Sequence, residues 1–222
     1  LSIQTISLAR QSGLMLTPKI MFAHQTVAEL AAVVEVKEDL NPIREVVAGD
    51  VPLTAIQHWF FEQNLEEMQH YNQAFLFEVA ERMDRGLLER ARKEVGRQHD
   101  ALRLRYVRES KGWRQFHALP EERPPLRWMT LTELGEAEWQ RKIETIAASV
   151  QASLNLEDGP LWSVAYFDLG SNRPGRLLFV VHHLAVDGIS WHPLLEDLET
   201  AYQQLKAGHA VQLPPKTFSY KA

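Results

Sequence analysis

Cysteine is absent from the 222 residues of the sequence. Its absence excludes disulfide bonds, thiolate metal sites and a cysteine nucleophile. The sequence also has no apolar run long enough to span a bilayer, and its first ten residues lack the basic-then-apolar order of a signal peptide. We therefore expect a cytoplasmic protein with no membrane partner.

Positive charge is not in excess, because 24 Lys and Arg residues stand against 29 Asp and Glu residues, for a net charge of -5. Nucleic-acid binding usually requires a basic face, so no nucleic-acid partner is expected. Hydrophobic residues make up 45% of the sequence, and its length allows one full core plus a smaller unit. The first residue is Leu1 rather than Met, and we expect a piece of a longer protein.

The first 36 residues predict a small helical unit. Residues 2–12 have the pattern of a helix end, with Gly13 as its stop. Thr26 and Glu29 have the spacing of a capping box that begins a second helix. These pieces are too few to hold a core, so the unit is expected to be incomplete. Residues 37–50 are charged and interrupted by proline and glycine, which predicts a linker.

From residue 51 onward, strand and helix patterns alternate after a capping box formed by Thr54 and Gln57. Strands are predicted over residues 72–79, 102–108, 113–118, 161–169 and 176–183, and helices over 84–99, 134–154 and 190–205. The second and third strands form a hairpin across residues 110–112. This order predicts an α/β (α+β) fold in which a mixed sheet is covered by helices.

The stretch VVHHLAVDGISW holds the candidate chemistry. The apolar run 177–181 predicts a strand buried on both faces. Side chains alternate along a strand, so His182 and His183 point to opposite sides, one to the interior and one free to face a cavity. That geometry argues against a shared metal ion, and no third ligand appears at a telling spacing, so no metal site is expected. The sequence alone leaves another interpretation open, in which the two histidines are a half-buried structural pair hydrogen-bonded to backbone carbonyls.

Asp187 and Gly188 follow the two histidines and suit a tight turn. Gly188 would let the chain bend without a Cβ clash. Asp187 could then fold back beneath the strand end and hold an imidazole or an arginine.

HHLAVDG resembles the HHxxxDG motif of the condensation-domain superfamily of nonribosomal peptide synthetases. RQHDALRLRY, residues 97–106, is similar to the RHExLRxxF segment of that superfamily, with Arg103 at the position that pairs with the motif aspartate. Such a pair is plausible because a buried carboxylate is costly unless an arginine satisfies it. The resemblance implies the N-terminal one of two chloramphenicol-acetyltransferase-like lobes, over residues 51–222.

Three segments resemble the epimerization branch of this superfamily: PLTAIQHWFFEQ, DGISWHPLLEDLETAYQQL and LPPKTFSYKA. His192 and Pro193 depart from it, since the branch often has Arg and Ile there. Residues 1–31 resemble the second half of a peptidyl carrier domain. By that resemblance, the serine that bears 4'-phosphopantetheine lies upstream of Leu1, so no cofactor is expected to be bound within this chain.

The resemblance implies epimerization of an L-aminoacyl or peptidyl thioester held on a carrier domain. His183 would be the base or acid on one face of the substrate, where its ordinary pKa of about 6.5 suits proton transfer. A glutamate of the second lobe would act on the other face. The remaining motif residues are expected to support the site or line its cavity: His182, Asp187 paired with Arg103, and Gly188 as support, with Ser190 and Trp191 at the cavity.

Two alternatives remain. A condensation domain would use the same histidine to position an amine for peptide-bond formation. A non-catalytic member would only dock carrier domains. In each case the expected partners are a carrier domain, the second lobe of the same domain and neighbouring synthetase modules. The 222-residue chain alone is expected to be inactive.

Overall fold

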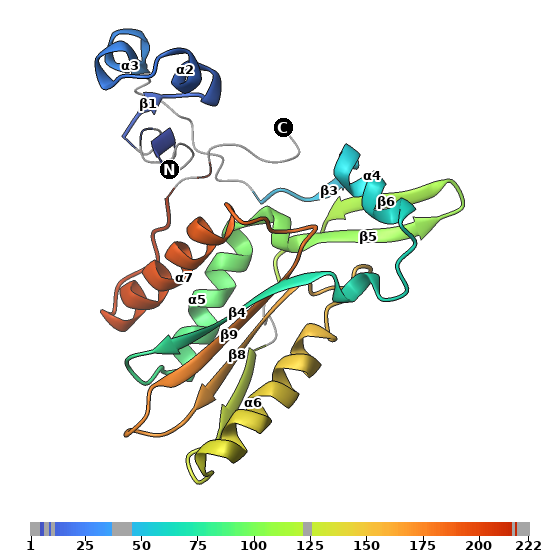
Figure 1. Cartoon of the computed structure of the whole chain (residues 1–222), viewed down its shortest axis with the longest axis vertical. Helices are drawn as coiled ribbons and strands as arrows, with labels where there is room; N and C mark the ends of the chain where they lie inside the picture. Colours follow the sequence, from blue (N-terminus) through green and yellow to red (C-terminus); the bar gives the residue numbers. More distant parts are fainter. Residues whose placement is uncertain are drawn as a thin grey trace. The chain divides into compact units, whose positions relative to one another are not determined.

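The computed structural model describes residues 5–6, 9, 12–36, 46–121, 126–214 and 216. These residues form two compact units, drawn from blue to red along the sequence in Figure 1; the smaller consists mainly of residues 1–44 and the larger mainly of residues 45–213. Within the described residues, no helix is both long and apolar enough to cross a membrane.

The smaller unit pairs two short strands and packs two short helices: β1 (Leu14–Met15), α2 (Pro18–Ala23), α3 (Val27–Val33) and β2 (Glu35–Val36). The capping box of α3 is confirmed, because Thr26 Oγ1 accepts a hydrogen bond from Glu29 N at 3.2 Å and Glu29 Oε2 accepts one from Thr26 N at 3.1 Å. Most of the helix predicted over residues 2–12 lies outside the described residues. Helix α2 was not predicted.

A four-stranded sheet forms the centre of the larger unit, in the order β4 (Asn72–Val79), β9 (Gly175–His182), β8 (Trp162–Asp168), β7 (Leu126–Thr130). β4 and β8 both run antiparallel to β9, whereas β7 runs parallel to β8. The parallel pair is possible because α6 (Glu136–Gln151) carries the chain from β7 back to the start of β8. Strand β7 was not predicted.

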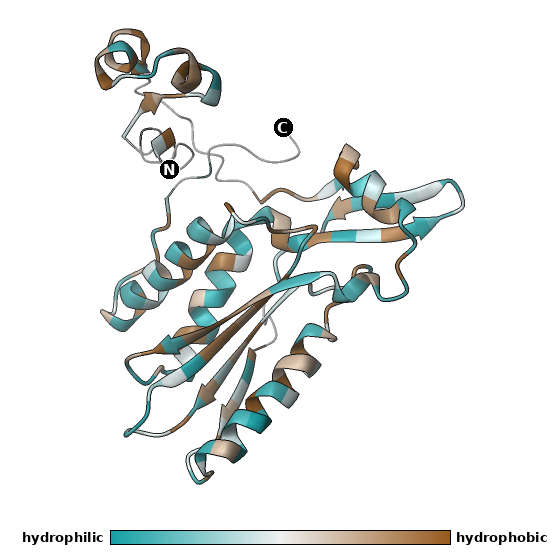
Figure 2. Ribbon diagram, in the orientation of Figure 1, coloured by the Kyte–Doolittle hydropathy of each residue, from teal (hydrophilic) through white to brown (hydrophobic). Residues whose placement is uncertain are grey.

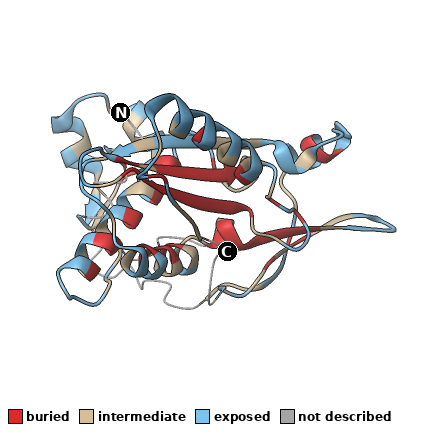
Figure 3. Ribbon diagram, turned by 90° about the horizontal axis from the view of Figure 1, so that it is seen from below, coloured by how far each residue is buried: buried red, intermediate tan, exposed pale blue. Residues whose placement is uncertain are grey.

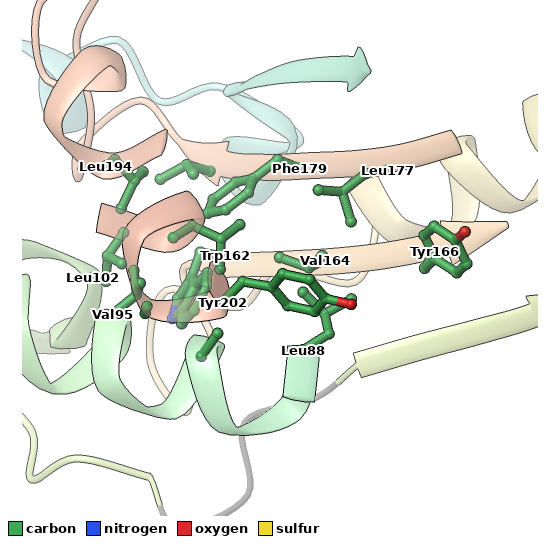
Figure 4. Close-up of a cluster of buried hydrophobic side chains, with 14 of the residues drawn as sticks. Leu88, Val95, Leu102, Trp162, Val164, Tyr166, Leu177, Phe179, Leu194 and Tyr202 are labelled. Carbon is green, nitrogen blue, oxygen red and sulfur yellow. The ribbon is translucent and has the colours of Figure 1, made fainter. Parts of the chain in front are cut away.

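Helices cover both faces of this sheet, with α5 (Arg85–Gln98) and α7 (Trp191–Lys206) on one side and α6 on the other (Figure 1). Side chains of the central strands alternate between the two layers. Trp162, Val164 and Tyr166 pack with α5 and α7, as Figure 4 shows, while Ala165 and Phe167 pack with α6. The central strands are therefore buried on both faces (Figure 3), as their continuous apolar sequence predicted.

A second, three-stranded sheet has the order β3 (Gly49–Val51), β6 (Gly112–His117), β5 (Leu104–Glu109). Helix α4 (Ala55–Glu62) packs Phe60 and Phe61 into the core of this sheet, where Phe61 stacks on Trp113 at 4.2 Å between ring centroids. Figure 2 shows that these strands carry a mixture of apolar and polar residues.

Two sequence predictions are corrected in this region. Strand β3 begins at Gly49, inside the segment predicted as a linker, because Gly49 and Asp50 pair with the far end of β6. The strand predicted from residue 102 begins only at Leu104, after a 3₁₀ turn over Asp100–Arg103. The mixed α/β class with helix-covered sheets is confirmed.

Candidate functional site

His182 is the last residue of β9, and its side chain is fully buried, with an exposed fraction of 0%. Its Nε2 donates to the Met68 carbonyl at 2.9 Å, and its Nδ1 accepts from Leu184 N at 3.1 Å. Burial lowers the pKa of His182 to about 4, so the ring is neutral near pH 7. Both ring nitrogens are satisfied by backbone, which suits a supporting role.

His183 leaves the strand on the opposite side and is only half-buried. Its Nδ1 lies 2.9 Å from the Val186 carbonyl oxygen, and its ring stacks on Tyr71, with 5.2 Å between centroids and 17° between the planes. Its Nε2 lies 3.2 Å from Gln73 Nε2. The two adjacent histidines therefore occupy different environments, as strand alternation predicted.

The register between β4 and β9 explains why Gln73 meets His183. Gln73 lies opposite Val181, and His183 is two residues further on the same face, which makes Gln73 its diagonal neighbour. The Gln73 side chain is held from its other end, because Trp191 Nε1 donates to Gln73 Oε1 at 2.6 Å. Sequence reasoning missed Gln73, although a polar Asn-Gln pair opening a strand that then turns apolar was a usable signal.

Asp187 holds neither an imidazole nor an arginine, and that prediction is wrong. Its Oδ1 accepts hydrogen bonds from Ile189 N at 3.1 Å, Ser190 N at 2.7 Å and Ser190 Oγ at 2.6 Å. This is the pattern of a cap on the turn that leads into α7. The pKa of Asp187 is lowered, chiefly by the hydrogen bond from the Ser190 hydroxyl.

Arg103 pairs with Asp100 instead of Asp187, so the predicted ion pair is also wrong. Arg103 is buried, with an exposed fraction of 3%, and its Nη2 donates to Asp100 Oδ1 at 2.7 Å. Its other hydrogen bonds go to the backbone carbonyls of Gly96, Arg97, Ala118 and Val47. Two of those carbonyls belong to the last turn of α5, where a cation is favoured. The Arg103 guanidinium is therefore hydrogen-bonded to nearby structure and does not reach Asp187.

The remaining three predicted site residues lie at the start of α7. The turn does not need glycine at position 188 to avoid the predicted Cβ clash, because a Cβ at Gly188 would have no heavy atom of the described residues within 4 Å, and the φ of Gly188 is not positive. Ser190 is exposed and points its hydroxyl at Asp187. Trp191 is buried in the core against Phe179, at 5.6 Å between centroids, with only its indole N–H directed at Gln73.

The described residues contain no group of three His, Cys, Asp or Glu side chains placed to hold a metal ion. A surface hollow of about 400 Å³ lies between β3 and β6, where Val51, Leu53 and Trp113 line it. It does not include His183. The chemistry of the His183 site therefore rests on a half-exposed imidazole whose neighbours are Tyr71, Gln73 and Val186. Trp191 acts on this site only through its hydrogen bond to Gln73.

A model of the condensation-domain family matches residues 47–222. The chain belongs to the condensation-domain family. Over its whole length it is 48% identical to one of the linear gramicidin synthase proteins of Brevibacillus parabrevis, and over 99% of its length it is 34% identical to tyrocidine synthase 2 of the same organism. It spans only 4% and 6% of the length of these two proteins.

Solved structures of condensation-family domains share its fold. The epimerization domain from the third module of tyrocidine synthetase B superposes with a TM-score of 0.74 at 36% identity, covering 80% of this chain and 40% of that one. The first condensation domain of the calcium-dependent antibiotic synthetase gives a TM-score of 0.63 at 27% identity, covering 75% of this chain and 40% of that one. The chloramphenicol-acetyltransferase-like fold class is confirmed.

Proposed function

We propose that this condensation-family chain contributes the first lobe of an epimerization domain in a nonribosomal peptide synthetase. The domain would invert Cα of an L-aminoacyl or peptidyl thioester on a carrier domain. The observation that carries the proposal is the greater likeness to a solved epimerization domain, at 36% identity, than to a solved condensation domain, at 27%. The three segments typical of the epimerization branch point the same way.

His183 is the group of this chain that would move the proton. The thioester acidifies the α-hydrogen, and the Nε2 lone pair takes it while the C–H electron pair stays on the substrate. A proton returned to the other face, from the expected glutamate of the second lobe, gives the D-isomer. His183 then loses its proton to solvent and the glutamate regains one, which completes a cycle without net oxidation or reduction. His182 cannot share this task, because both of its ring nitrogens are occupied in the interior.

The partners follow from the same proposal. Residues 1–36 would belong to a carrier domain, and its linker would end before β3 begins at Gly49. The 4'-phosphopantetheine arm of a carrier would bring the thioester to His183. The second lobe would close the exposed side of the site, where Asp187, Gly188 and Ser190 face solvent. Such a synthetase would work in the cytoplasm among its neighbouring modules. The 222-residue chain alone would then be inactive.

Condensation is the second candidate, since the matching family model is that of the condensation domain. Deuterium uptake separates the two activities. The complete protein that contains this chain would be loaded with an L-aminoacyl or a peptidyl thioester in deuterated water, followed by measurement of deuterium at Cα and of the D/L ratio after release. The variants are His183→Ala and, as a matched control at an exposed histidine outside the site, His209→Ala.

Epimerization predicts deuterium uptake and D-product that persist in His209→Ala and disappear in His183→Ala. Amide formation with a supplied acceptor, without uptake at Cα, would assign the chain to condensation. A folded protein with neither activity would favour the carrier-docking alternative.

A further inference from the structure

We propose that Gln73 and Trp191 are positioning residues that hold the His183 imidazole in the tautomer whose Nε2 is unprotonated. Three hydrogen bonds connect these groups in series. Trp191 Nε1 lies 2.6 Å from Gln73 Oε1, Gln73 Nε2 lies 3.2 Å from His183 Nε2, and His183 Nδ1 lies 2.9 Å from the Val186 carbonyl oxygen. The catalytic half of this inference rests on the proposed function; the tautomer itself does not.

The direction of every bond in the series is fixed from its two ends. An indole N–H only donates, so the Gln73 atom that faces Trp191 is the amide oxygen, and the Gln73 NH2 group faces His183. At the other end a carbonyl oxygen only accepts, so His183 Nδ1 carries the proton. The Nε2 lone pair of the neutral ring then accepts from the Gln73 NH2 group.

The opposite tautomer of His183, protonated at Nε2, would lose the hydrogen bonds to both Gln73 and Val186. A proton on Nε2 would face the NH2 group of Gln73, and the Nδ1 lone pair would face the Val186 carbonyl oxygen. Rotating the Gln73 amide by 180° does not remove the conflict, because the NH2 group would then face the Trp191 N–H and two donors would meet. Unpaired donors and acceptors of this kind cost more than a formed bond gains, so only one arrangement is stable.

Rigid elements position both groups. Gln73 lies in β4, which is paired along its full length with β9, and Trp191 is packed in the core between Phe179 and Phe75, at 5.6 and 4.8 Å between ring centroids. A base that removes an α-hydrogen must present an unprotonated nitrogen, and this pair maintains one before substrate arrives. The 3.2 Å contact is at the long end of the hydrogen-bond range, so substrate can displace it.

The test begins with long-range ¹⁵N–¹H correlation spectra of the nine histidines in the 222-residue chain at pH 8. His183→Gln identifies the signals of His183. The wild type should show a neutral ring protonated at Nδ1. Gln73→Leu should move the Nε2 resonance toward that of a nitrogen without a hydrogen bond and should bring in the second tautomer. Trp191→Phe should do the same to a smaller extent, since it frees the amide to rotate.

Two matched controls remove the same groups elsewhere. Gln203→Leu removes an exposed amide on α7, and Trp139→Phe removes an indole N–H that has no hydrogen-bond partner among the described residues. Neither should change the His183 signals. Gln73→Glu preserves the size of the side chain if the leucine variant fails to fold. Its carboxylate accepts only, so it should draw a second proton onto His183 and give an imidazolium spectrum.

Activity completes the test in the protein that contains the carrier and both lobes. Loss of one hydrogen bond of ordinary strength predicts a roughly five-fold lower kcat for deuterium uptake in Gln73→Leu, with KM nearly unchanged. A wild-type His183 protonated at Nε2, or spectra that Gln73→Leu and Gln73→Glu leave unchanged, would overturn the inference. Shifted spectra in a wild-type protein without deuterium uptake would retain the positioning role and refute epimerization.

Discussion

Arg103 donates to Asp100 at 2.7 Å, three residues away, and both side chains are buried. This pair, together with four backbone carbonyls, ties the end of α5 to the start of β5 and to the segments around Val47 and Ala118. The residue that resembles the partner of a motif aspartate is therefore a local structural clamp in this chain.

A double-mutant cycle tests that clamp. Arg103→Met should lower the free energy of unfolding by about 3 to 5 kcal/mol, because it removes the guanidinium that is paired with the buried Asp100 carboxylate. Its coupling to Asp100→Asn should be about 1 to 3 kcal/mol, whereas its effect and that of Asp187→Asn should add to within about 0.5 kcal/mol. Denaturant unfolding of the single and double variants measures both terms. Strong coupling to Asp187 would contradict the observed pairing.

His182 should make stability depend on pH. Its pKa is about 4 in the fold and about 6.5 in the unfolded chain, so the unfolded state binds the proton more tightly. The stabilisation from neutral His182 is complete above pH 6.5 and is lost as the pH falls from 6.5 to 4. It amounts to about 3 kcal/mol at most.

The measurement is the free energy of unfolding across that pH range. His182→Gln preserves a donor for the Met68 carbonyl and does not titrate, so the slope should flatten. His58→Gln, at an exposed histidine, is the control for the substitution itself. An equal slope in wild type and His182→Gln would show that the buried ring is not responsible.

Asp187 should behave as a cap on the turn that precedes α7. Asp187→Ala removes an acceptor of three hydrogen bonds and should cost about 1 kcal/mol of stability, whereas Asp187→Asn retains an acceptor oxygen and should cost less. The lowered pKa of Asp187 adds stability that is present above the unfolded pKa, about 3.9, and is lost as the pH falls through the folded value. Thermal unfolding of both variants at pH 7 and pH 3 measures these effects; an asparagine variant as unstable as the alanine variant would contradict the capping role.

Gly188→Ala should leave the free energy of unfolding within about 0.5 kcal/mol of the wild type, since the added Cβ points into open space. Gly175→Ala is the matched contrast. A Cβ at that position would clash with the hydroxyl oxygen of the buried Tyr166, so we expect a loss of more than about 1 kcal/mol. A Gly188→Ala variant as unstable as Gly175→Ala would restore the tight-turn role that the sequence predicted.

Local sequence determined most of the elements of this protein. Strand 72–79 was predicted to its ends, and α5, α6 and α7 were predicted to within about three residues, because periodicity, capping residues and glycine turns are encoded within each segment. The HHxxxDG resemblance likewise identified the family from a few neighbouring residues. Strand β7 was missed because it is short and becomes a strand only by pairing in parallel with β8, more than thirty residues later.

Tertiary structure alone decided the partners of the site residues. Arg103 and Asp187 have opposite charges, so the sequence suggested that they pair. Each instead bonds to a residue three positions away, Asp100 and Ser190 respectively. A local partner requires closure of a shorter loop and therefore a smaller loss of chain entropy. Gln73 and His183 are 110 residues apart and meet only because the register of β4 on β9 places them diagonally on one face. Alternation along β9 then separates a buried, backbone-satisfied His182 from a half-exposed His183. Which of the two histidines has a side chain accessible from outside the core thus depends on strand register and burial, which no local pattern encodes.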